Sequence, residues 1–139
     1  MNLIKYKLFK YDVFDEGWGC GWRTLQNCVS KLLSIEISIE NIMHDLRNKN
    51  YIFNDSHYGF LDGNMIIDFL KNYNNLSVKQ FDILSDSDIT YVIDIMNNLN
   101  YNKFCGILIH DGYIIMIDNI NNHEIHIVDP HQHPSTDSF

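Results

Sequence analysis

The sequence predicts an α+β fold in which helices from the first two thirds of the chain pack on a C-terminal antiparallel sheet. Apolar residues recur at helical spacing in several segments before residue 98, whereas short apolar or alternating runs separated by turn residues follow residue 103. Helices that precede strands in this way favour α+β over the alternating strand–helix units of a parallel sheet. A length of 139 residues fits one domain with a single core, spanning residues 1–139.

Four helices are predicted. The first spans roughly residues 20–33, and its apolar positions follow helical spacing at Trp22, Leu25, Cys28, Val29, Leu32 and Leu33. Ser38 and Asp62 are suitable N-caps for the second and third helices, and Ser85 with Asp86 opens the fourth. The side chains expected to face the core from these three helices are Ile39, Ile42, Met43 and Leu46; Met65, Ile66, Phe69 and Leu70; and Ile89, Val92, Ile93 and Met96.

The strands are expected mainly in the last third of the chain, where they form an antiparallel meander. The expected strands are residues 3–14, 77–84, 104–110, 113–118 and 123–129. We expect a tight turn or a bulge at residues 111–112, a turn at residues 119–122 and a loop at residues 51–60. Pro130 and Pro134 mark the end of the regular sheet.

Composition excludes several classes of function. The net charge of −8 and the pI near 5.1 argue against nucleic-acid binding and against anionic membrane surfaces. Three scattered cysteines do not make a disulfide framework, which favours reduced thiols and a cytoplasmic protein. The first ten residues alternate charged and apolar side chains, so they do not resemble a signal peptide, and no apolar run approaches transmembrane length.

The functional interpretation depends on Cys20. It lies in residues 15–26, which read Asp-Glu-Gly-Trp-Gly-Cys-Gly-Trp-Arg-Thr-Leu-Gln, and the first predicted helix begins at this point. The N–H groups and the dipole of a helix N-terminus favour a thiolate, which is the nucleophilic form of cysteine. An isolated cysteine is ordinarily a buried structural residue, but core packing gives no reason for three glycines within five positions. We therefore interpret Cys20 as a candidate nucleophile.

A second motif follows the last predicted strand, where residues 129–131 read Asp-Pro-His. In an extended chain residues i and i+2 point to the same side, so Asp129 and His131 project together. The proline between them fixes one torsion angle. A carboxylate beside an imidazole can hold its tautomer and stabilise the imidazolium. Brought to Cys20 by packing of the sheet on the first helix, this pair makes a nucleophile, a base and a residue that orients the base.

The same chemistry needs hydrogen-bond donors for an oxyanion. The backbone N–H of Cys20 is one candidate, and Tyr11 or, less favourably, Tyr6 is a second, although the residues alone favour an ordinary strand aromatic for either tyrosine. No cofactor is predicted. The closely spaced histidines near the C-terminus do not make a zinc ligand set, so no metal is predicted, and Cys28 and Cys105 are interpreted as small buried apolar residues.

Three motifs follow one another along the chain. Residues 17–26 contain Gly-Trp-Gly-Cys-Gly-Trp-Arg, residues 106–110 read Gly-Ile-Leu-Ile-His, and residues 128–131 read Val-Asp-Pro-His. They resemble the ubiquitin-fold-modifier-specific proteases. These are papain-like cysteine peptidases that mature a modifier precursor and remove the modifier from target proteins, cutting after its C-terminal glycine. The resemblance implies a papain-like fold and, as partners, a ubiquitin-like modifier with a glycine-ended tail and its conjugates.

The resemblance also implies roles for individual residues. It assigns Cys20 as nucleophile, His131 as general base and acid, Asp129 as the residue that orients His131, and Tyr11 as part of the oxyanion hole.

A glycine-ended tail must reach the thiolate in extended form through a slot that excludes larger side chains. Trp18, Gly19, Trp22 and His110 are the candidate substrate-binding residues. Trp18 and Trp22 are placed to be walls of the slot, although Trp22 also fits the apolar stripe of the first helix and is then a core residue.

Three alternatives stay open at this stage. The chain is also similar to autophagy-related cysteine proteases, which share Gly-Trp-Gly-Cys and Asp-Pro-His. Another thiol enzyme of the same layout, such as a deubiquitinase or an acyltransferase, fits the same residues. A catalytically weak relative that only binds a modifier is the non-enzymatic alternative.

Overall fold

The computed structural model describes residues 19–54, 58–99, 103–110, 113–121, 124–128 and Pro130. Within this part of the chain, helices precede strands, and the α+β class is confirmed. The elements are α1 (Cys20–Leu33), α2 (Ile39–Asn48), α3 (Gly63–Leu70), α4 (Asp86–Asn97), β1 (Gly106–His110), β2 (Tyr113–Asn121) and β3 (Glu124–Val128). The strand expected at residues 3–14 lies outside the described residues.

The strands form the predicted antiparallel meander in the order β1-β2-β3. His110 pairs with Tyr113 at one end of the β1–β2 ladder, and Val128 pairs with Met116 in the β2–β3 ladder. The register of that second ladder shifts between Ile117 and Asn119, so one residue of β2 has no partner opposite it.

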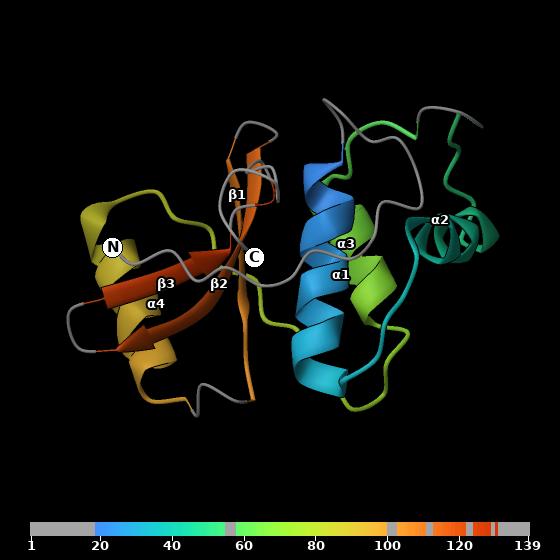
Figure 1. Cartoon of the computed structure of the whole chain (residues 1–139). Helices are drawn as coiled ribbons and strands as arrows, with labels where there is room; N and C mark the ends of the chain where they lie inside the picture. The colour runs from blue at the N-terminus through green and yellow to red at the C-terminus, as the bar shows by residue number, and fades with distance from the viewer. Residues whose placement is uncertain are drawn as a thin grey trace.

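The sheet lies between two helical layers (Figure 1). α1 covers one face, with α2 and α3 beyond it, and α4 lies against the other face. Gly106 permits the close approach of α4, because a Cβ built there would lie 3.0 Å from the Met96 Cε and 3.2 Å from the Ile117 Cβ. No helix in the described ranges combines the length and apolar character that a membrane crossing requires.

α1 is the central element of the core. Each residue from Cys20 to Val29 is buried, because the helix is covered by the sheet on one side and by α2 and α3 on the other. The core residues around α1 come from all these elements: Trp22, Leu25, Val29, Ile39, Ile42, Leu46, Phe53, Leu61, Ile66, Phe69 and Ile114. A helix in this position must bury its polar side chains as well as its apolar ones.

The predicted N-caps are confirmed. Ser38, Asp62 and Ser85 precede α2, α3 and α4, and the side chain of each accepts a hydrogen bond from the backbone N–H three residues later, at 3.0, 2.9 and 3.4 Å. Each bond satisfies a donor that has no partner within the helix, which explains why the helices begin where they do.

Three expectations are wrong. Residues 77–84 form no strand: nearly all of them are exposed, and none of the three strands in the described part of the chain pairs with them. Ile89 is 43% exposed rather than part of the core, and the buried residue of α4 is Met96, near the other end of the helix. The turn expected at residues 119–122 is instead part of β2 as far as Asn121, where the ladder with β3 continues.

Candidate functional site

Cys20 is the first residue of α1, as predicted. The N-cap is Gly19, with φ −83° and ψ −3°, and its carbonyl accepts the first helical hydrogen bond from the Arg23 N–H at 2.9 Å. Gly19 has no side chain to cap the helix, and the first turn contains no acidic residue. The partial positive charge of the N-terminus is therefore not compensated within the turn that carries the thiol. The Cys20 side chain is 8% exposed, at the edge of the core.

Gly21 explains part of the glycine content of the motif. A Cβ at Gly21 would lie 3.0 Å from the Leu61 Cβ and 3.1 Å from the Ile114 Cδ1. The first turn of α1 is thus wedged between the segment before α3 and the beginning of β2. Core packing therefore does give a reason for Gly21, contrary to the expectation from the sequence, because the close packing here leaves little room for a side chain.

Trp22 occupies the core. Its side chain is fully buried, its ring lies 5.3 Å from that of Phe53 and 5.4 Å from that of Tyr58, and its Nε1–H donates to the Gly59 carbonyl at 2.8 Å. This is the packing role that its place in the apolar stripe indicates. Through these contacts Trp22 fixes the segment around Gly59 beside the first turn of α1.

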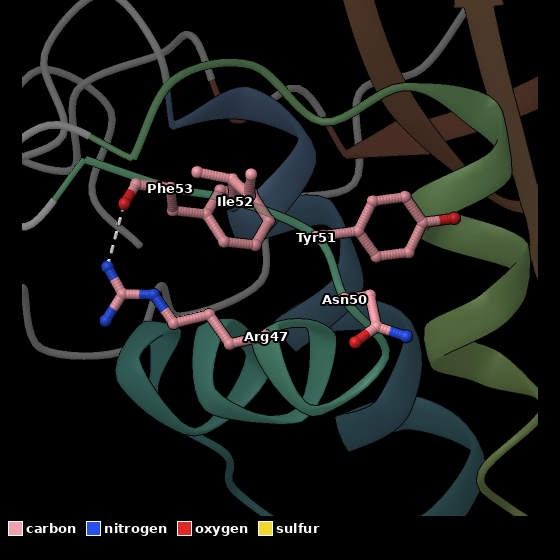
Figure 2. Close-up of a pocket in the computed structure, with 5 residues that line it drawn as sticks. All are labelled: Arg47, Asn50, Tyr51, Ile52 and Phe53. Carbon is pink, nitrogen blue, oxygen red and sulfur yellow. Dashed lines mark hydrogen bonds between the residues drawn. The ribbon is translucent and has the colours of Figure 1, made fainter.

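Phe53 also lines an open hollow of about 540 Å³ on the surface, together with Arg47, Asn50, Tyr51 and Ile52 (Figure 2). The Arg47 Nη2 donates to the Phe53 carbonyl at 2.8 Å. The Tyr51 hydroxyl donates to the Asp68 carboxylate, and this bond is the main cause of a raised pKa of Tyr51. The Arg47 guanidinium and the Tyr51 hydroxyl at this hollow are therefore both engaged in hydrogen bonds within the protein.

β2 runs alongside α1 in the same direction. Ile114 lies against Gly21 and its carbonyl accepts from the Thr24 Oγ1 at 3.5 Å, while Asp118 pairs with Lys31 at the other end of the helix. The distance along α1 from Gly21 to Lys31 agrees with the distance along β2 from Ile114 to Asp118, because ten helical residues rise about 15 Å and four strand residues about 13 Å. The start of β2 is therefore level with the end of α1 that carries Cys20.

This register places His110 and orients β3. His110 is exposed and pairs with Tyr113, next to the Ile114 that touches Gly21, so it lies at the Cys20 end of the hairpin. β3 runs antiparallel to β2, and Val128 is already opposite Met116. The chain therefore runs along β3 from the Lys31 end of α1 toward the Cys20 end.

Four of the predicted site residues lie outside the described part of the chain: Tyr11, Trp18, Asp129 and His131. The structure thus describes Cys20, Gly19, Trp22 and His110. The approach of His131 to Cys20 stays a prediction.

The sequence interpretation missed the buried polar side chains of α1. Arg23 and Gln26 are almost completely buried, the Arg23 Nη1 donates to the Gln26 Oε1 at 2.9 Å, and the Gln26 Nε2 donates to the Ile37 carbonyl at 2.8 Å. Asn27 is also buried, and within the described residues its Nδ2 has no hydrogen-bond partner. The spacing within α1 carries no signal for this burial, because the apolar residues of the helix form a single stripe.

Phe60 is a further residue that the sequence interpretation did not single out. It is 60% exposed and lies between Gly59 and Leu61, which both contact the first turn of α1. An exposed aromatic side chain thus lies on the segment that flanks the cysteine. Nothing in its local sequence distinguishes it from an ordinary loop residue.

The other two cysteines lie away from the helix N-terminus. Cys28 is fully buried in a small cluster with Met116 and Val128, and the half-buried Cys105 packs against the same cluster. The contact with the Cys105 thiol and burial both raise the pKa of Cys28 well above its ordinary value. Cys28 is therefore a neutral thiol with the packing role that was predicted for it.

We expect this thiol to make stability fall in alkaline solution. A group whose pKa is raised on folding stabilises the protein below its unfolded pKa, which is about 9 for a thiol, and this contribution is lost as the pH rises above that value. The limiting slope is about 1.4 kcal/mol per pH unit for one proton. Urea unfolding between pH 8 and pH 10.5 should show a shallower decline for Cys28→Ala than for the unchanged chain. Parallel curves would contradict the assignment.

Within the described ranges, no group of three His, Cys, Asp or Glu residues lies close enough to hold a metal ion. Comparison of the chain with models of protein families, with curated proteins and with solved structures finds no match in any of the three. The functional interpretation therefore depends on the chemistry and geometry of the residues themselves.

Proposed function

We propose that the chain is a thiol peptidase that cleaves after the C-terminal glycine of a ubiquitin-like modifier, with Cys20, His131 and Asp129 as its catalytic residues and a papain-like fold. The observation that carries the proposal is the position of Cys20. It opens the central helix after an N-cap without a side chain, in a turn without acidic residues. Such a turn favours a thiolate, which a thiol peptidase requires.

The direction of β3 supports the second half of the proposal. Asp129 and His131 follow directly after Val128, and β3 leads toward the Cys20 end of α1. Only a few residues are needed beyond Val128, because one extended residue spans about 3.3 Å. The motif is therefore at the correct end of the strand for a base that must reach Cys20.

The proposed reaction has two stages. His131 accepts the thiol proton of Cys20, and the thiolate attacks the carbonyl carbon of the terminal glycine. The oxyanion accepts hydrogen bonds from the Cys20 N–H and from the Tyr11 hydroxyl. His131 then protonates the leaving amine as the C–N bond breaks, which leaves a thioester on Cys20. Water, deprotonated by His131, attacks the thioester and releases the glycine carboxylate and the free thiol.

The proposed substrate requirement follows from the first turn of α1. Gly19 brings no side chain next to Cys20, so an extended tail can approach the backbone closely at that residue, whereas the space beside Gly21 is filled by Leu61 and Ile114. Trp18, His110 and the exposed Phe60 are the side chains that we assign to contact the tail. Trp22 stabilises this arrangement from the core rather than by contact with the substrate.

The proposal is tested with modifier proteins that carry an electrophile at the C-terminal glycine. A panel that includes ubiquitin, a ubiquitin-fold modifier and an autophagy-type modifier should label the chain with one covalent addition, detected by intact mass and mapped to Cys20. Cys20→Ala should abolish labelling, whereas Cys28→Ala, a matched buried cysteine of the same helix, should retain it.

The panel also separates the alternatives. The modifier that labels the chain fastest identifies the substrate class. Fastest labelling by ubiquitin would indicate a deubiquitinase, and fastest labelling by the autophagy-type modifier would indicate an autophagy-type protease. Saturable binding of a modifier without labelling of Cys20, or labelling that persists in Cys20→Ala, would contradict the proposal.

A further inference from the structure

The beginning of α4 is surrounded by exposed apolar side chains. This group, called the α4 patch below, consists of Phe81, Ile83, Leu84, Ile89 and Tyr91. Leu84 is 89% exposed and Tyr91 is 60% exposed, so these two side chains present most of their surface to the solvent. An apolar group of this kind on one element is a feature of interaction surfaces, whereas single exposed apolar residues are ordinary.

The local structure does not account for the exposed surface. Leu84 and Ile89 occupy the two positions around the Ser85 N-cap that commonly cover one another, yet Leu84 remains almost completely exposed. Phe81 and Tyr91 contact each other edge to face, with ring centroids 6.1 Å apart, rather than the core. Met96 is the buried residue by which α4 is anchored.

The segment that carries the patch is predominantly acidic. Residues 79–94 contain four carboxylates, from Asp82, Asp86, Asp88 and Asp94, and one ammonium group, from Lys79. The Asp88 carboxylate accepts a hydrogen bond from the Leu84 N–H at 2.9 Å, which holds the most exposed side chain of the patch at the acidic start of the helix. A partner that covers the apolar side chains must therefore approach these carboxylates.

Charge selects among possible occupants. A second copy of the chain would bring the same acidic patch against itself in a twofold interface, and the whole chain carries a net charge of −8. An anionic partner surface is also disfavoured, because its negative charge would be repelled by the carboxylates of this segment. Arginine or lysine next to apolar side chains is the complementary chemistry, and a guanidinium group can also pack on the faces of Phe81 and Tyr91.

We propose that the α4 patch is a docking surface for a protein segment that presents apolar side chains beside arginine or lysine. It lies with α4 on the face of the sheet opposite α1 (Figure 1). The proposal is independent of the chemistry of Cys20.

The test uses three fluorescent peptides of equal length as probes: alternating leucine and arginine, alternating leucine and glutamate, and alternating serine and arginine. Fluorescence anisotropy with the full chain should show binding of the leucine–arginine peptide about tenfold tighter than of either other peptide, because both components of the surface are needed. Added salt should weaken this binding. Amide exchange should show protection in residues 79–93.

Matched variants locate the binding. Leu84→Ser and Tyr91→Ala should each lower the affinity for the leucine–arginine peptide about tenfold, as is expected for central residues of an interface. Ile52→Ser is the control, because Ile52 is equally exposed but lies in the chain after α2. The Cys20 labelling rate should be unchanged in all three variants, which separates this proposal from that of the peptidase.

Three results would overturn the proposal. One is an affinity for the leucine–arginine peptide that is the same in Leu84→Ser as in the unchanged chain. Another is concentration-dependent association of the chain that Leu84→Ser removes, since a second copy would then be the occupant. The third concerns the lysines of the N-terminal sequence, outside the described residues. If replacing them by glutamate raises the affinity for the peptide, the chain's own N-terminal segment occupies the patch; the positions are Lys5, Lys7 and Lys10.

Discussion

Replacement of His131 by alanine should lower kcat/KM for a glycine-ended modifier substrate by about 10³-fold, within the 10²–10⁴ range that general acid–base catalysis contributes. The same side chain would otherwise accept the Cys20 proton and return it to the leaving amine, so both steps of acylation lose their proton carrier. Asp129→Asn should cost less, because it weakens the orientation and charge stabilisation of the imidazole without removing it. Steady-state hydrolysis of a modifier carrying a C-terminal fluorophore measures both losses.

A matched histidine controls for indirect effects. His44 is exposed on α2, so His44→Ala should change kcat/KM by less than about twofold, as expected for a surface substitution away from the site. Retention of most activity by His131→Ala would contradict its role as base. Equal losses for His131→Ala and Asp129→Asn would contradict the assignment of Asp129 as the orienting residue.

Asp118→Asn should destabilise the fold by about 3–5 kcal/mol, the range for breaking a buried ion pair. The Lys31 Nζ lies 2.9 Å from the Asp118 Oδ1, with side chains only 9% and 6% exposed, and it also donates to the Asp118 carbonyl. The register shift of β2 makes this double contact possible, because Asp118 has no partner in the ladder with β3. The substitution leaves the Lys31 ammonium group buried with no carboxylate. Urea unfolding measures the loss.

An exposed pair provides the control. The Lys49 Nζ lies 3.8 Å from the Asp45 Oδ2 with both side chains about one third exposed, so Asp45→Asn should cost less than about 1 kcal/mol. The double replacement Lys31→Met with Asp118→Leu should recover much of the loss from Asp118→Asn, because no unpaired charge remains. If Asp118→Asn costs no more than Asp45→Asn, water reaches the Lys31 pair and the assignment fails.

The helices could be predicted closely because their signals are local. The apolar spacing gave α1 its bounds, and three side-chain caps set the starts of α2, α3 and α4. The strand at residues 77–84 failed because a strand depends on a neighbour that pairs with it, and no local pattern shows whether that neighbour exists. The same limit explains Ile89, which has the correct spacing for a core residue but is 43% exposed near the start of α4.

The site was predicted in part for the same reason. The position of Cys20 at a helix start depends on its immediate sequence, so it could be predicted. The burial of Arg23 and Gln26 depends on two layers that enclose α1 from opposite sides, and the close contact of Gly21 with Leu61 and Ile114 joins segments far apart in the chain. Neither can be derived from spacing within α1.

The contacts of α1 with β2 have a consequence for how the protein folds. The Thr24–Ile114 hydrogen bond joins residues 90 apart, and the Lys31–Asp118 contact joins residues 87 apart. Closing so long a loop is slow compared with the formation of local helices. During synthesis α1 therefore leaves the ribosome well before the strand that covers it, with both its apolar and its buried polar side chains still accessible. Any thiol reactivity at Cys20 that depends on the packed first turn of α1 therefore develops only after β2 has closed onto the helix.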